Sequence, residues 1–127
     1  MLASGTLMGF VPTSDYGRAR HFYEGQLGLE FVSLDQFALE MKVGGHLIRI
    51  SKAPSVTPSQ GTILGWEVGN IEAVAMWLEQ QGVTLEKLPF AQDRKLGIWT
   101  APNGDRVAWF KDPDGNTLSI SQHTERS

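Results

Sequence analysis

Short apolar runs and polar breaks alternate along this chain with the spacing of strands and amphipathic helices. An apolar run over 7–11 is followed by Asp15, by a helical pattern to about residue 26, and by Gly28 before a further strand pattern. An aspartate side chain accepts N–H groups at a helix start, and glycine suits the backbone that ends a helix. The first stretch therefore predicts a strand, a helix and a second strand.

The same order occurs again in the second half of the chain. A strand pattern over 63–68 precedes Asn70, a helical pattern over 71–81, Gly82 and a strand pattern over 84–88. The remaining strand patterns lie at 29–34, 37–43 and 46–51 in the first half, and within 97–110 and at 116–122 in the second. We therefore predict the order β-α-β-β-β twice.

The repeat predicts how the chain is organised. We expect a single domain over residues 1–127, with module one at 5–52, a linker rich in proline and serine at 53–61, and module two at 62–123. One such module cannot bury both faces of its sheet. The predicted fold class is α+β, with helices covering the outer faces of a mixed sheet whose inner faces form a trough.

The glycine pair at 44–45 fixes the register of one hairpin. A two-residue glycine loop favours a tight turn, and the pairs that flank it follow directly. Met41 then lies opposite Ile48 on an apolar face, and Glu40 lies opposite Arg49 on the other face. The first pair is predicted to be core.

A turn of sequence DPDG at 112–115 begins the last strand pattern. Side chains alternate between the two faces of a strand, so Leu118 and Ile120 share one face. We predict that these two residues are core and that the hydroxyl residues between them face the trough. Those hydroxyl residues are Thr117, Ser119 and Ser121.

Composition excludes several classes of protein. The net charge is −3 and no stripe of Lys and Arg is available for phosphates, so nucleic acid is not an expected partner. The chain has no cysteine, which removes disulfides, thiolate metal sites and cysteine nucleophiles. No apolar run approaches the roughly 18 residues of a membrane span, and the first residues lack the pattern of a signal peptide. We expect a cytoplasmic protein with no membrane partner.

Two stretches carry a resemblance to a known family. SDYGRARHFYEGQLGLEF at 14–31 and FKDPDGNTLSI at 110–120 resemble the helix and the ending of the glyoxalase/bleomycin-resistance/extradiol-dioxygenase superfamily, also called vicinal oxygen chelate proteins. The resemblance covers nearly the whole chain in order and spacing. It implies paired βαβββ modules that form a cup-shaped mixed sheet, with helices on its outer face. Many enzymes of the family hold a divalent metal in the cup.

The resemblance also implies where a metal-using member would place its ligands. Carried over to this sequence, those positions are Met8, Arg49, Ile63 and Ser119. A divalent ion prefers imidazole nitrogens or carboxylate oxygens, which none of these side chains offers, and the guanidinium would bring a positive charge to the place of the cation. We therefore expect no metal and no other cofactor, as in the metal-free bleomycin-resistance members.

Strand parity predicts which side chains line the cup. The predicted ligand-binding residues are Met8, Phe10, Arg49, Ile63, Ser119, Trp99 and Trp109. The two tryptophans lie in a loop-like segment, where the alternative is core packing. Trp66 and Trp77 are predicted to lie in the core under the helices.

Glu40 and Glu67 are the carboxylates that parity turns inward, so they are weak candidates for a general base. The Glu40–Arg49 pair has two interpretations, a cross-strand ion pair that fills space or an arginine held ready to bind a carboxylate. The histidines show no ligand spacing and are interpreted as surface or structural residues. Only His123 shares strand parity with Ser119.

These observations favour a metal-free protein that sequesters an aromatic or carboxylate-bearing small molecule in the cup. The alternative is a lyase, isomerase or dioxygenase of the same superfamily, which would need a metal or an acid–base pair. A third possibility is a protein whose cup has no important ligand. Exposed strand edges also predict a homodimer.

Overall fold

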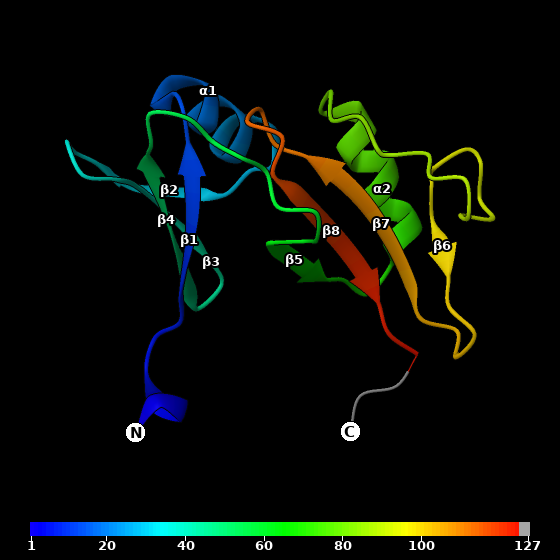
Figure 1. Cartoon of the computed structure of the whole chain (residues 1–127). Helices are drawn as coiled ribbons and strands as arrows, with labels where there is room; N and C mark the ends of the chain where they lie inside the picture. The colour runs from blue at the N-terminus through cyan, green and yellow to red at the C-terminus, as the bar shows by residue number, and fades with distance from the viewer. Residues whose placement is uncertain (125–127) are drawn as a thin grey trace. The chain divides into compact units, whose positions relative to one another are not determined.

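A computed structural model describes residues 1–124 of the chain (Figure 1). The chain divides into two compact units, Met1–Thr57 and the part that begins at Pro58, and the division falls within the expected linker. In residues 1–124 no helix is long and apolar enough to cross a membrane.

The first unit is a four-stranded mixed sheet with one helical segment. After a short 3-10 turn η1 (Leu2–Ser4), its elements are β1 (Met8–Thr13), α1 (Tyr16–Arg20), the π-helical η2 (His21–Gln26), β2 (Glu30–Leu34), β3 (Leu39–Val43) and β4 (His46–Lys52). The strand order is β1-β4-β3-β2, with β1 parallel to β4 and the other neighbours antiparallel. This is the predicted βαβββ order.

One face of the first sheet packs under α1 and η2. The buried side chains on that face are Val11, Leu39, Met41, Ile48 and Ile50, and the helical segment buries Ala19, Phe22 and Tyr23 against them. The hairpin register is as predicted, with Met41 opposite Ile48 and Glu40 opposite Arg49. The buried apolar face supplies the main stabilisation of this unit.

The start and end of the first helical segment follow the sequence signals. The Asp15 side chain accepts a hydrogen bond from the Arg18 backbone N–H at 3.1 Å, and Gly28 has a φ of 78° after the last turn. The second half of the segment differs from the predicted α-helix, because the Leu27 N–H donates to the Phe22 carbonyl at 2.9 Å. That wider bond gives η2 its π-helical turn.

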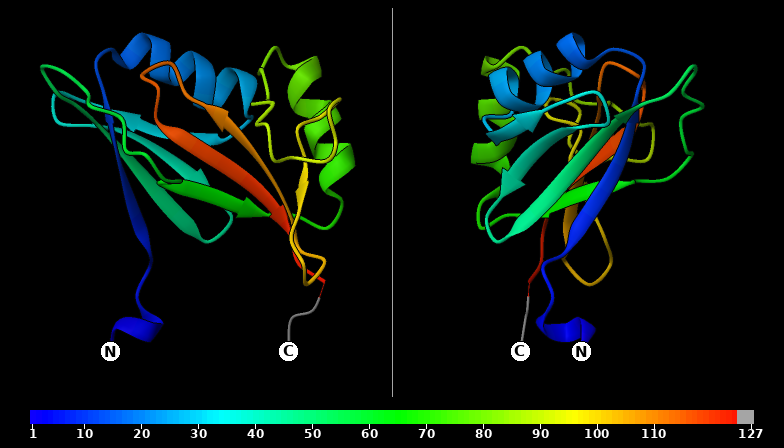
Figure 2. Two further views of the ribbon diagram at one scale, coloured as in Figure 1. Left: turned by 45° about the vertical axis from the view of Figure 1, so that its right-hand side comes forward. Right: turned by 90° about the vertical axis from the view of Figure 1, so that its left-hand side faces the viewer.

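The second unit repeats the plan, with short strands at β5 and β6 (Figure 2). Its elements are β5 (Leu64–Glu67), α2 (Ile71–Gln80), β6 (Trp99–Thr100), β7 (Arg106–Lys111) and β8 (Thr117–Gln122). The order is β5-β8-β7-β6, with β5 parallel to β8. Asn70 caps α2 by accepting from the Ala73 N–H at 3.1 Å, as expected. Both units confirm the α+β fold class with two βαβββ modules.

The face of the second sheet under α2 contains its core. Ala108, Phe110, Leu118 and Ile120 are buried there, as predicted for the last two, and Trp66 stacks on Phe110 with ring centroids 6.3 Å apart. Trp77 differs from the prediction because it is 40% exposed on α2. The helix buries Ile71, Ala75 and Leu78 instead, so its apolar stripe passes beside the indole.

The predicted strand at 84–88 is wrong except at one point. Only Leu85 pairs with β7, through an isolated bridge to Phe110, and the Glu86 N–H donates to the Trp109 carbonyl at 2.8 Å. Pro89 follows directly and has no N–H to continue a ladder. The segment therefore runs as an irregular loop to Gly97, and β6 supplies the remaining pairs with β7.

Candidate functional site

The first unit has an open face, which we define as the side of its sheet opposite α1. Phe10, Arg49 and Glu40 lie side by side across β1, β4 and β3 on that face. Phe10 is 68% exposed and Met8, two residues earlier in β1, is 38% exposed. The structure thus brings together the three ligand-binding candidates of the first half of the chain.

Arg49 is held by its neighbour on β3. Its Nη1 donates to Glu40 Oε2 at 2.9 Å, and both side chains remain partly exposed. Such an ion pair at a wet surface contributes about 0–1 kcal/mol to stability. One side of the guanidinium fork is used by Glu40, which fixes the direction in which the remaining N–H groups point.

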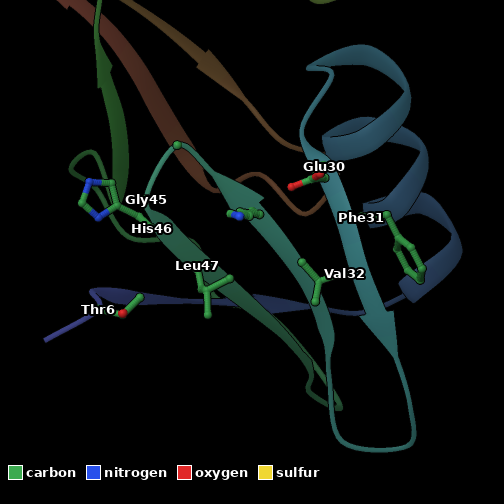
Figure 3. A pocket seen from close by; sticks show the side chains of 9 residues that line it. Thr6, Glu30, Phe31, Val32, Gly45, His46 and Leu47 are labelled. Carbon is green, nitrogen blue, oxygen red and sulfur yellow. The ribbon is translucent and has the colours of Figure 1, made fainter.

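The first unit includes two hollows beside its open face. One of about 260 Å³ is lined by Phe10, Pro12 and Ser51 among others, so it adjoins the open face. The other, of about 640 Å³, lies at the β3–β4 hairpin between the start of β2 and the chain before β1 (Figure 3). It includes His46 and Leu47, but not Met8, Phe10 or Arg49. Leu47 lies opposite Met8 in the register of β1 and β4, so the larger hollow is on the open face beside Met8.

The second unit also has an open face, on the side of its sheet opposite α2. One row across it runs from Glu67 in β5 to Ser121 in β8, Val107 in β7 and Trp99 in β6. The adjacent row runs from Gly65 to Ser119 and Trp109. Ile63, just before β5, has the same parity and is 37% exposed. Every site residue predicted in the second half lies on this face or at its edge.

The two tryptophans form an aromatic cluster with a residue that the sequence pattern did not indicate. Phe90 contacts both Trp99 and Trp109 edge to face, at centroid distances of 6.1 Å and 5.9 Å, and the indoles lie 6.3 Å apart. Phe90 is 57% exposed and both indoles are half-buried. Flat apolar surface therefore remains accessible beside Ser119.

Gly65 leaves space above the Ser119 hydroxyl. A Cβ added at Gly65 would lie 2.9 Å from Ser119 Oγ and 3.5 Å from the Ser119 carbonyl oxygen. A larger residue at position 65 would therefore force the hydroxyl to rotate. The glycine keeps the centre of the second open face shallow and polar.

The end of β8 lies near the β6–β7 loop (Figure 1). A hydrogen-bonded relay of side chains joins these two segments. His123 Nε2 is 3.0 Å from Ser121 Oγ, and His123 Nδ1 is 2.9 Å from Asp105 Oδ2. Thr124 binds the other carboxylate oxygen through its N–H at 3.0 Å and its hydroxyl at 3.2 Å. These hydrogen bonds, first that of the Thr124 N–H and then that of His123, lower the pKa of Asp105 to about 2.

Sequence reasoning found only part of this relay. The parity of His123 indicated its face, because it lies two residues after Ser121. Asp105 could not be found in this way, since a loop residue has no strand parity. His123, interpreted from the sequence as a surface or structural residue, makes two specific hydrogen bonds.

The turn at 112–115 has a structural role. The Asp112 side chain is buried and accepts from the N–H groups of Asp114 and Asn116, at 3.0 Å and 2.9 Å. The Asn116 amide donates to the second carboxylate oxygen at 2.9 Å. Both buried polar side chains have their partners within the turn, which fixes the start of β8 and thus the faces of its side chains.

The residues at the positions that the resemblance assigns to a metal do not fit a divalent ion. In the first unit these are a thioether, Met8, and the guanidinium of Arg49 with its bond to Glu40. In the second unit they are the aliphatic Ile63 and the hydroxyl of Ser119. Within residues 1–124, no group of three or more His, Asp or Glu side chains is arranged to hold a metal. Such ions need several carboxylate or imidazole ligands.

Two βαβββ units, each with a helix on one face and an open face on the other, define the class of paired-module α+β proteins. A model of the Glyoxalase/Bleomycin resistance protein/Dioxygenase superfamily matches residues 6–120. The chain belongs to this superfamily. No protein of curated function matches the sequence.

Solved structures share the fold at low sequence identity. A glyoxalase family protein from Enterococcus faecalis has a TM-score of 0.75 at 21% identity, covering 95% of this chain and 99% of that chain. A glyoxalase/bleomycin resistance protein/dioxygenase from Alicyclobacillus acidocaldarius has a TM-score of 0.73 at 13% identity, covering 96% and 93%. A virulence protein from Salmonella typhimurium has a TM-score of 0.70 at 22% identity, covering 98% and 100%. At these identities the likeness concerns the fold.

Proposed function

We propose that the protein binds and sequesters a small aromatic or carboxylate-bearing molecule without a metal ion. The observation that carries this proposal is the aromatic cluster of Phe90, Trp99 and Trp109 beside Ser119 on the second open face. Accessible aromatic surface next to hydroxyl groups suits a planar ligand with polar substituents. The mismatch of the four metal positions supports the metal-free form.

The first open face supports the carboxylate part of the proposal. Arg49 offers a guanidinium whose orientation is set by Glu40, and Phe10 lies beside it with most of its side chain exposed. A guanidinium binds a carboxylate through paired hydrogen bonds. Phe10 and Arg49 together therefore offer an aromatic acid a partner for each of its chemical parts on the first open face.

The test uses 2-naphthoate as a probe, with binding measured by calorimetry and by quenching of tryptophan fluorescence. We expect Trp109→Ala to weaken binding about 3–10-fold, because a stacked aromatic pair contributes about 0.5–1.5 kcal/mol. Trp77→Ala is the control for loss of an accessible indole, since Trp77 is 40% exposed but lies on α2, across the sheet from the cluster. Equal affinity in the wild type and the Trp109 variant would contradict the proposal.

The enzymatic alternative has a separate test. Metal analysis of purified protein, with assays of lactoylglutathione formation and aromatic ring cleavage, is expected to give substoichiometric metal and no turnover. Stoichiometric metal together with turnover would replace sequestration by lyase, isomerase or dioxygenase chemistry. Glu40 and Glu67 would then be the first carboxylates to substitute.

We also propose a homodimer, which light scattering during size-exclusion chromatography tests.

A further inference from the structure

The relay at the end of β8 has the geometry of an activated nucleophile. A serine, a histidine and an aspartate are linked in sequence by contacts of 3.0 Å and 2.9 Å. In nucleophilic catalysis the nucleophile lies about 2.6–3.2 Å from a base, and a third group orients that base. The chain order of such a triad varies between folds, so the geometry alone defines it.

The hydrogen bonds around Asp105 set the tautomer of the histidine. An ionised carboxylate can only accept, so the Nδ1 of His123 carries the proton that points to Asp105. The Nε2 atom of the neutral ring is then an acceptor for the Ser121 hydroxyl. Thr124 holds the other oxygen of Asp105, which prevents the carboxylate from turning away. This is the tautomer that removes a proton from serine.

The relay is accessible from the second open face. The side chains of His123 and Asp105 are 23% and 24% exposed, and Ser121 is half-buried on β8. Val107 lies opposite Ser121 on one side, and Trp99 lies opposite Val107. On the other side, Glu67 in β5 lies opposite Ser121 in the strand register. An acyl compound at Ser121 could thus lay an aromatic group against Val107 and Trp99.

We propose that Ser121 is a nucleophile for aryl esters, with His123 as the general base and Asp105 as its positioning residue. Ser121 Oγ forms a bond to the ester carbonyl carbon while its proton passes to His123 Nε2. The bond between the carbonyl carbon and the aryloxy oxygen then breaks. The departing phenolate takes the proton from His123 and leaves as a phenol. Water, deprotonated by His123, then attacks the acyl-serine, which releases the carboxylic acid and restores Ser121 with its proton.

The phenol defines the substrate class. A phenol has a pKa of about 10, as in tyrosine, so a phenolate leaves more readily than the oxygen of an aliphatic alcohol. A relay that supplies a nucleophile and a base therefore acts first on aryl esters. Acyl transfer of this kind is a chemical activity, distinct from the ligand sequestration proposed above.

The experiment measures hydrolysis of p-nitrophenyl acetate by the full chain, together with intact mass and peptide mapping after rapid acid quench. We expect one acetyl group on Ser121 in the wild type. Ser121→Ala should lose that acetyl group and lower the protein-dependent rate about 100-fold or more, as should His123→Ala. Asp105→Asn should lower the rate at least about tenfold while Ser121 remains in place.

Ser33→Ala and His46→Ala are the matched controls, since they remove the same groups from exposed positions in the first unit. Both should keep the wild-type rate. Thermal unfolding identifies folded variants, and Ser121→Cys tests the role directly, because a thiol at this position should also be acetylated. Acetylation of lysines or the N-terminus alone, or an unchanged rate in folded Ser121→Ala, would overturn the proposal.

Discussion

Arg49 and Glu40 show how a single pair of residues changes what a fold position can do. The register predicted from the glycine loop places them opposite each other, and the 2.9 Å ion pair follows from that placement. A cation at a position that the resemblance assigns to a metal ligand repels metal ions but attracts anions. The Arg49 guanidinium therefore argues against a bound metal ion and in favour of an anionic ligand.

Replacing Arg49 tests this role at the level of the residue. Arg49→Met should weaken 2-naphthoate binding about tenfold, because the ligand carboxylate loses its donors while an apolar chain of similar length remains. Calorimetry with 2-naphthoate and with uncharged naphthalene methanol measures the two affinities, and only the first should fall. The stability of the fold should change by about 0–1 kcal/mol, as for other partly exposed ion pairs.

Arg20→Met is the control for the change in charge. Arg20 pairs with Glu24 at 2.7 Å, but it lies on the helical side of the first unit, over the Phe31 ring. The Arg20→Met variant should leave the affinity for 2-naphthoate unchanged. If Arg49→Met also leaves that affinity unchanged, its pair with Glu40 is only structural.

At the scale of elements, the loop at 84–98 departs most from the sequence pattern. The apolar alternation at 84–88 predicts a strand, yet only Leu85 forms a bridge to β7. Gly97 returns the loop toward this point with a φ of 77°, and its α-carbon packs against the Glu86 carbonyl. The conformation of this loop therefore depends on packing between the segments around Glu86 and Gly97. Such a contact cannot be predicted from the local sequence pattern.

Gly97→Ala should therefore destabilise the protein. An added Cβ would overlap the Glu86 carbonyl oxygen, and alanine also disfavours a positive φ. Together these effects should cost about 3 kcal/mol and lower the Tm by about 10 °C, measured by calorimetry or circular dichroism.

Gly45→Ala is the matched control in the β3–β4 hairpin. A Cβ at Gly45 meets nothing within 4 Å, and the residue has no positive φ. It should shift the Tm by only a few degrees. Equal melting temperatures for the two variants would show that the Glu86 contact is not a constraint.

The fold could be predicted because its signals are local. Asp15 and Asn70 cap their helices, Gly28 and Gly82 follow them, and the glycine loop fixes a register. The face of a candidate side chain could be predicted where strand parity applies, as for Ser119. Phe90 and Asp105 were missed because they lie in loops, whose side chains are placed by tertiary contacts. Trp77 was assigned to the core because it matches Phe22 in the repeat, but of the two only Phe22 is buried.

For the molecule as a whole, two aspartates link stability to pH. The backbone N–H groups of Phe37 and Ala38 lower the pKa of Asp35 in the first unit, and the Thr124 N–H and His123 lower that of Asp105 in the second. A carboxyl group whose pKa is lower in the folded state binds protons more weakly there than in the unfolded chain. Its contribution is therefore complete above the unfolded pKa and is lost as the pH falls.

Acid should destabilise the protein between pH 4 and pH 2, the interval between the ordinary pKa of 3.8 and the folded pKa of about 2 for Asp105. Asp105→Asn removes this titration, so its Tm should fall less steeply over the same interval. Thermal unfolding of both proteins at closely spaced pH values measures the two slopes. Identical slopes would mean that the carboxylate titrates alike in the folded and unfolded states.

The two units also provide an internal standard for chemical reactivity. Ser51 lies two residues after Arg49 in β4, as Ser121 lies two residues after Ser119 in β8, and both hydroxyls are half-buried on open faces. Two residues further on, the first unit has Ala53 where the second has His123. A single labelling reaction on one unmodified chain therefore compares a serine with and without an imidazole neighbour. The ratio of the two modified peptides reports the effect of that neighbour without any substitution.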